Sequence, residues 1–210
     1  DSIKNSTFSW GRPLNIKGAP WYNSTEAKDQ TYDHLASISS FGATNEQSLI
    51  ASGGNDKTTF YLSFGRTYEK SHWIDWSEYK ELVPTTYGHK PNRETPSDYT
   101  RHTIRLKGSH LLNKNLTLSS SISYVKVNTN NIARAHTTDG IGRGLLSTPP
   151  DFNLLPYLNP ETQYHRTSTN EASTNPQGPH SWNNPYWVLF EMMQKQELNR
   201  IYGNIKIDYK

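Results

Sequence analysis

The stretch that decides the fold is residues 51–65, ASGGNDKTTFYLSFG. Within it, Phe60, Leu62 and Phe64 occupy every second position, and a tyrosine, a serine and a glycine alternate with them. A period of two predicts a β-strand, because successive side chains of a strand point to opposite faces of the sheet. The Gly-Gly-Asn-Asp run before it predicts a tight turn, since glycine and asparagine tolerate a positive φ. The stretch is therefore typical of a β-hairpin whose second strand has one aromatic and aliphatic face.

The composition favours a β-rich protein with a wet interior. The chain has 210 residues, which is enough for one domain with a sizeable core. Hydrophobic residues nevertheless make up only 32% of it, and the mean hydropathy is -0.85. Disordered chains share such low hydrophobicity, but they are poor in aromatic residues, which form 12% of this chain. A wide β-barrel fits better, because its interior needs no apolar core.

Several classes of function are disfavoured. The absence of cysteine excludes disulfides, thiolate metal sites and thiol catalysis. The net charge is only +3 and no Lys/Arg block occurs, so no electrostatic footprint for nucleic acid is present. The eight histidines form no i,i+4 metal pair, and no catalytic set emerges. We therefore expect no enzyme, no metal and no cofactor. No apolar run approaches the ~20 residues of a membrane helix, but barrel strands alternate and escape such a scan.

The chain as a whole predicts five strands with very unequal connections. Ile104 and Leu106 alternate with Arg105 and Lys107, and the other strands show the same contrast of an apolar and a polar face. Strand lengths near the ~9–11 residues that cross a bilayer, with short turns and long loops, favour an all-β fold, part of a large antiparallel transmembrane outer-membrane β-barrel. A half-buried strand of a soluble protein gives the same alternation, so a soluble domain stays open. The predicted strands are 45–52, 57–68, 99–110, 116–128 and 197–210; the predicted extracellular loops are 1–44, leading into the barrel, 69–97 and 129–196.

An ordered series of motifs resembles one family. The series consists of FSWGRPL (8–14), SLIASGGNDKTTFYLSFG (48–65), the hairpin YTRHTIRLKGSHLLNKNLTLSSSISYVKVNTNN (99–131), NNPYW (183–187) and NRIYGNIKIDYK (199–210). In content and order it is similar to the barrel of SusC/RagA-type TonB-dependent outer-membrane transporters. No single motif is diagnostic, and the ordered series carries the resemblance.

The resemblance implies a function. Such proteins import glycans or peptides across the cell outer membrane of Gram-negative bacteria, together with a SusD-type surface lipoprotein that closes over the barrel. Their energy comes through TonB, and outer-membrane lipid surrounds them. In that family a plug domain and a first strand precede the Ser-Trp-Gly loop, so we expect this chain to be a piece of a longer protein, without the plug and the TonB-contact segment. A passive porin or adhesin barrel, and a soluble extracellular glycan-binding β domain, remain as alternatives.

Two groups of side chains are candidates for contact with a ligand. Aromatic rings in the predicted loops offer stiff surfaces for a substrate or a partner protein, although they also suit packing of the loops on one another. Basic side chains on the polar faces of the strands are expected to face the lumen, where they pair with carboxylates of a plug. The aromatic candidates are Trp73, Trp76, Tyr157, Tyr164 and Trp182; the lumen-facing candidates are Arg105, Lys107, Arg200 and Lys206.

Overall fold

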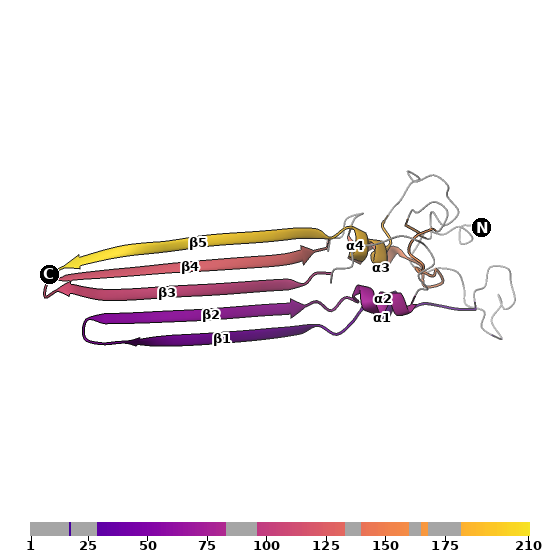
Figure 1. Cartoon of the computed structure of the whole chain (residues 1–210). Helices are drawn as coiled ribbons and strands as arrows, with labels where there is room; N and C mark the ends of the chain where they lie inside the picture. The colour runs from indigo at the N-terminus through magenta and orange to yellow at the C-terminus, as the bar shows by residue number, and fades with distance from the viewer. Residues whose placement is uncertain (1–16, 18–28, 83–95, 133–139, 160–164, 168–181) are drawn as a thin grey trace. The chain divides into compact units, whose positions relative to one another are not determined.

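In the computed structural model of the protein, the chain divides into two compact units (Figure 1). The sheet unit comprises residues 42–71, 97–131 and 195–210, and the helical unit comprises residues 1–41, 72–96 and 132–194. The residues that the structure describes are 17, 29–82, 96–132, 140–159, 165–167 and 182–210.

The sheet unit is a single five-stranded antiparallel sheet in which each strand pairs with the next one along the chain. Figure 1 shows the five strands side by side in the order β1-β2-β3-β4-β5. The sheet is not closed into a barrel. All five predicted strands are confirmed, with bounds within three residues of the prediction. The strands are β1 (Ala43–Gly54), β2 (Thr58–Lys70), β3 (Tyr99–Asn113), β4 (Leu116–Asn131) and β5 (Gln194–Tyr209).

The turn between β1 and β2 explains the Gly-Gly-Asn-Asp run. The backbone N–H of Asn55 donates to the carbonyl of Thr58 at 2.7 Å. The side-chain oxygen of Asn55 accepts from the N–H groups of Lys57 and Thr58 at 3.0 and 2.9 Å. A Cβ atom at Gly54 would lie 2.3 Å from the Thr58 carbonyl oxygen, so only glycine fits there. The turn was therefore predictable from its sequence.

The register of the strands separates apolar from polar residues. Residues directly opposite each other in an antiparallel pair share a face of the sheet. Leu62 lies opposite Leu106, which lies opposite Ile122 in turn. One residue further along β2, Ser63 lies opposite Arg105, which lies opposite Ser123. The register therefore gives one face that is mainly apolar, the apolar face, and one that is mainly polar, the polar face, although Ile50 of β1, opposite Ser63, lies on the polar face.

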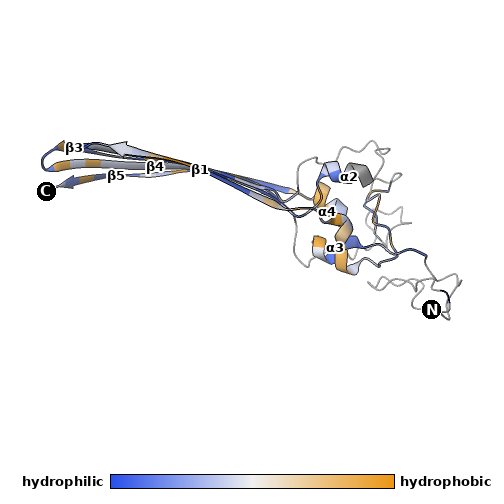
Figure 2. Cartoon of the chain, turned by 90° about the horizontal axis from the view of Figure 1, so that it is seen from below, coloured by the Kyte–Doolittle hydropathy of each residue, from blue (hydrophilic) through white to orange (hydrophobic). Residues whose placement is uncertain are grey.

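The helical unit lies in segments that were predicted as irregular loops. Its helices are α1 (His34–Ile38), α2 (Trp76–Leu82), α3 (Ile141–Ser147) and α4 (Pro185–Glu191). The fold is mostly β, but the predicted loop 1–44 contains α1, the predicted loop 69–97 contains α2, and the predicted loop 129–196 contains α3 and α4. Figure 2 shows hydrophobic colours on parts of α3 and α4 and a mixture of hydrophilic and hydrophobic colours along the strands. In the part of the chain that is described, no helix is long and apolar enough to cross a membrane.

A hydrophobic core holds the helical unit together. Its members come from three parts of the chain that are far apart in sequence, and they pack around α4. Backbone hydrogen bonds join the same parts: the N–H of Ile74 donates to Ile38, and the N–H of Tyr32 donates to Pro150, at 3.1 and 2.7 Å. The buried apolar residues of this core are Ile38, Trp73, Ile74, Tyr79, Ile132, Ile141, Leu154, Tyr157, Leu158, Tyr186, Val188, Leu189 and Phe190.

Local caps explain where two of the helices begin. At α2, the Asp75 carboxylate accepts from the N–H groups of Ser77 and Glu78 at 2.8 and 3.1 Å. The Glu78 carboxylate accepts from the N–H of Asp75 at 2.9 Å, which completes a capping box. At α4, the side chain of Asn184 accepts from Tyr186 at 2.9 Å, and a proline occupies the first helical position.

Candidate functional site

The apolar face of the sheet leaves many large side chains exposed. Phe60 is 54% exposed and Ile205 is 77% exposed, although both are strongly apolar. Soluble monomers rarely expose a contiguous apolar patch of more than a few hundred Å². These exposed side chains make the apolar face a candidate contact surface. Its exposed members are Leu49, Phe60, Leu62, Ile104, Leu106, Leu118, Ile122, Ile201, Ile205, Ile207 and Tyr209.

Side-chain contacts between β4 and β5 decide which residues of β5 belong to each face. Ser121, on the polar face, donates to Asn204 at 2.6 Å. Tyr124, on the apolar face, donates to Asn199 at 2.8 Å. Since faces alternate along a strand, the odd-numbered residues of β5 share the apolar face and the even-numbered residues share the polar face. Ile201, Ile205 and Ile207 thereby continue the apolar face to the edge of the sheet.

All four cations predicted to face a lumen lie on the polar face. Arg105 donates through Nε to the Ser123 hydroxyl at 3.2 Å. The Lys107 ammonium lies 5.6 Å from the centre of the Tyr61 ring, and Lys206 forms an ion pair with Asp208. Arg200 is an even-numbered residue of β5 and so belongs to the same face. That this face lines a lumen remains a prediction.

These cations differ in whether a carboxylate of the described residues pairs with them. The Lys206 ammonium lies 2.7 Å from the Asp208 carboxylate. Among the residues that the structure describes, no carboxylate pairs with Arg105, Lys107 or Arg200. The polar face therefore has positive charge available for an acidic or strongly polar partner.

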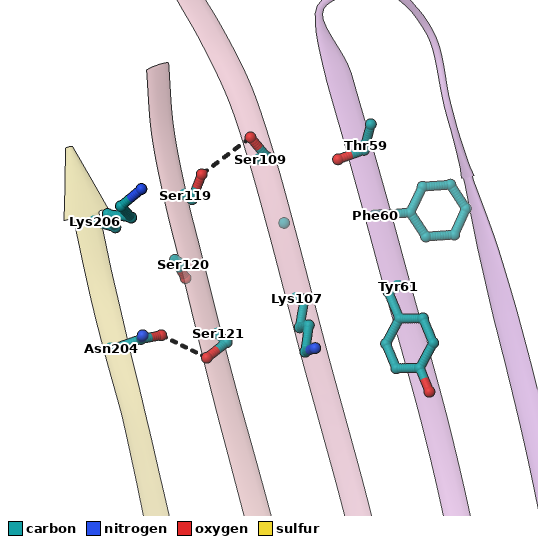
Figure 3. A pocket seen from close by; sticks show the side chains of 11 residues that line it. Thr59, Phe60, Tyr61, Lys107, Ser109, Ser119, Ser120, Ser121, Asn204 and Lys206 are labelled. Atoms are coloured by element: carbon teal, nitrogen blue, oxygen red, sulfur yellow. Dashed lines mark hydrogen bonds between the residues drawn. The ribbon is translucent and has the colours of Figure 1, made fainter. Parts of the chain in front are cut away.

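A hollow of about 560 Å³ lies on the polar face (Figure 3). Figure 3 shows Ser119 and Ser121 of β4 between Lys107 of β3 and Lys206 of β5. The Ser119 hydroxyl donates to Ser109 at 3.1 Å. The lining offers hydroxyls, an amide and two ammonium groups, and it contains neither a histidine nor a carboxylate to act as a general base. Its chemistry suits hydrogen bonding to a polar solute or to protein carboxylates.

Of the five aromatic contact candidates, Trp73 and Tyr157 belong to the core of the helical unit and Trp76 packs against it. Trp73, Tyr157 and Trp182 are buried, and Trp76 is partly buried against the same core. Tyr164 lies outside the described residues. This burial favours the alternative in which these rings pack the segments on one another. Their contact with a substrate or a partner stays a prediction.

The buried rings touch one another closely. The Tyr79 ring lies 5.4 Å from Tyr157 and 5.0 Å from Phe190, centre to centre. Trp76 meets Phe190 edge to face at 5.6 Å. Such pairs add about 0.5–1.5 kcal/mol each beyond the burial of their area. Phe190 was not among the sequence candidates, because α4 was not predicted.

Two buried phenols connect distant segments. Tyr157 donates to the Glu191 carboxylate at 2.7 Å, and Tyr186 donates to the carbonyl of Ser37 at 3.2 Å. Burial raises the pKa of Tyr157 well above its usual value, and the bond to Glu191 raises it further. Burial also raises the pKa of Tyr186. Both phenols stay protonated, and they act here as structural hydrogen-bond donors.

The NNPYW motif owes its role to Asn184, which sequence reasoning missed as a core residue. Asn184 is fully buried. Its amide nitrogen donates to the carbonyls of Leu154 and Arg166 at 3.1 and 2.7 Å, while its oxygen caps α4. Each polar atom of this side chain therefore has a partner, and the motif ties three segments of the helical unit together.

Comparison with known proteins adds no identification. No family model matches the sequence, and no curated protein shows significant similarity to it.

Proposed function

We propose that the sheet is part of the wall of a transmembrane β-barrel in the outer membrane, with the apolar face toward lipid and the polar face toward water. The observation that carries the proposal is the exposure of large apolar side chains across all five strands of one face. In water this exposure is unfavourable by about 25 cal/mol for each Å² of apolar surface. Acyl chains of a bilayer remove that cost.

The lengths and polarity of the strands support the same proposal. The strands span 12, 13, 15, 16 and 16 residues, which exceeds the ~9–11 residues that a tilted barrel strand needs to cross a bilayer. The opposite face carries mainly serines, threonines and cations, as expected beside an aqueous lumen, together with the exposed Ile50 and Leu198. A soluble glycan-binding domain would need another explanation for the exposed isoleucines of β5.

We further propose, on the resemblance of the ordered motifs, that this barrel belongs to a TonB-dependent importer of glycans or peptides. A SusD-type surface lipoprotein is the proposed partner, and TonB contact is proposed for a segment outside these 210 residues. The barrel would catalyse no reaction and hold no cofactor. A passive porin or adhesin barrel would have the same two faces, so loss of uptake in a strain without TonB distinguishes the importer from it.

Single cysteines test the orientation of the two faces, because the chain contains no cysteine of its own. Leu62→Cys and Ser63→Cys are adjacent positions on opposite faces, and Ile122→Cys and Ser121→Cys form a second pair. Each variant of the full-length protein carries a fluorophore on its cysteine and is reconstituted in phosphatidylcholine vesicles.

We expect nitroxide-labelled lipid to quench the label at positions 62 and 122, and aqueous iodide to quench it at positions 63 and 121. The reverse pattern would show that the polar face lies toward lipid and the apolar face toward water. Equal quenching by iodide at all four positions would show that no lipid covers the apolar face, and the proposal would be wrong.

A further inference from the structure

Three basic side chains lie in a row across strands β2, β3 and β4, at the level where the large apolar side chains of the apolar face end. Arg66 of β2 lies opposite His102 of β3, and His102 lies opposite Lys126 of β4. Two residues closer to the tight turn between β1 and β2, Phe64 and Tyr124 occupy the same face on strands β2 and β4. The three side chains, which we call the basic row, therefore lie on the apolar face, where its large apolar side chains end.

Aromatic groups and one carboxylate surround the basic row. The Arg66 guanidinium lies 5.9 Å from the centre of the Tyr68 ring, and the His102 ring lies 6.3 Å from Phe64. Lys126 pairs with Glu197 at 3.0 Å. Among the described residues, no carboxylate pairs with Arg66. The basic row thus keeps an excess of positive charge.

The opposite face has no such row at the same level. There Thr67 lies opposite Arg101, and Arg101 lies opposite Val127. At this level the polar face therefore carries one cation, between a threonine and a valine, where the apolar face carries three basic side chains. A line of three basic side chains, two of them permanent cations, is therefore found on the apolar face and not on the polar face at this level.

We propose that the basic row binds the phosphate of an anionic lipid headgroup, an inference that rests on the proposed membrane orientation of the sheet. Neighbouring strands lie about 4.8 Å apart, so the row spans about 10 Å, which suits one headgroup. Arginine pairs with phosphate through two parallel hydrogen bonds, and lysine does so as a point charge. The order from aliphatic to aromatic to basic side chains is the order of the membrane interface. Because the basic row adjoins the large apolar side chains of the same face, a lipid fits this site better than a free anion does.

The test titrates the full-length protein, purified in a nonionic detergent, with phosphatidylglycerol and separately with phosphatidylcholine, and counts bound lipid by native mass spectrometry. We expect phosphatidylglycerol to bind more tightly. Arg66→Gln and Lys126→Gln should each weaken its binding about fivefold, because a basic residue near an anionic lipid surface contributes about 1 kcal/mol. Glu197→Gln should strengthen binding, since it frees the ammonium of Lys126.

Arg101→Gln is the matched control, because it removes one cation at the same level on the opposite face. Equal weakening by Arg101→Gln, or no weakening by either basic-row variant, would overturn the inference. Displacement of the lipid by inorganic phosphate at equal concentration would identify a free-anion site and overturn it as well. A protein that binds both lipids equally contradicts only this inference, whereas one that binds neither contradicts the proposed membrane function.

Discussion

The sheet unit and the helical unit treat their apolar residues in opposite ways. In the helical unit, Val188, Leu189 and Phe190 are completely buried. In the sheet unit, Ile201, Ile205 and Ile207 are each at least two-thirds exposed. One unit satisfies its apolar side chains by packing them on each other, and the other presents them outward. The number of apolar residues in a unit therefore does not show whether they form a core or an outward-facing surface, because that depends on the residues packed against them.

The largest expected effect comes from truncating one apolar side chain in each unit and comparing the two losses of stability. Phe190→Ala removes a ring that contacts Trp76, Tyr79 and Tyr157 in the core, and it should cost about 3–5 kcal/mol of stability. Ile205→Ala, in detergent, should cost far less, because detergent rather than protein surrounds that side chain. Urea unfolding gives both values when it is followed by tryptophan fluorescence for Phe190→Ala and by the far-ultraviolet circular dichroism of the sheet for Ile205→Ala, because the tryptophans lie outside the sheet unit. Equal losses would show that the two kinds of apolar residue are equally packed.

A charge on each face of the sheet sharpens the comparison. Leu62→Arg and Ile104→Arg should impair assembly in the membrane by about 2–4 kcal/mol if the sites lie near the bilayer midplane. Ser63→Arg and Thr103→Arg, on the polar face of the same strands, are the matched controls and should be tolerated. The yield of heat-modifiable protein on electrophoresis measures assembly. If both faces tolerate arginine equally, the lipid-facing assignment fails.

The smallest expected effect concerns pH and the helical unit. Because burial raises the folded-state pKa of Tyr157, its contribution to stability is complete below the unfolded pKa of about 10 and is lost as pH rises above that value. We expect the thermal midpoint of the helical unit to fall above that pH. Tyr157→Phe should reduce this pH dependence and cost about 1 kcal/mol at neutral pH, since the bond to Glu191 is lost. An unchanged alkaline profile would show that Tyr157 does not titrate on unfolding.

Much of the sheet was predictable from the sequence because its signals are local. The alternation around Leu62 and the Gly-Gly-Asn-Asp turn each lie within a few residues, and the confirmed strands follow from them. Helices α2 and α4 were missed although their caps are also local: Asp75 and Glu78 form a capping box, and Asn184 precedes a proline. The proline-rich surroundings concealed these short helices.

By itself, the sequence determined which residues alternate along the strands and where the tight turn forms. Because it contains no cysteine, it also excluded any disulfide within these 210 residues. The tertiary structure alone decided that Tyr157 is buried, because Tyr79 and Phe190 reach it from segments far away in the chain. It also decided that Arg66 and Lys126 lie in one row, because that depends on the register of three strands. The physical reason is the range of the interactions: a period or a turn is set by neighbouring residues, whereas burial and register depend on contacts between residues that only folding brings together.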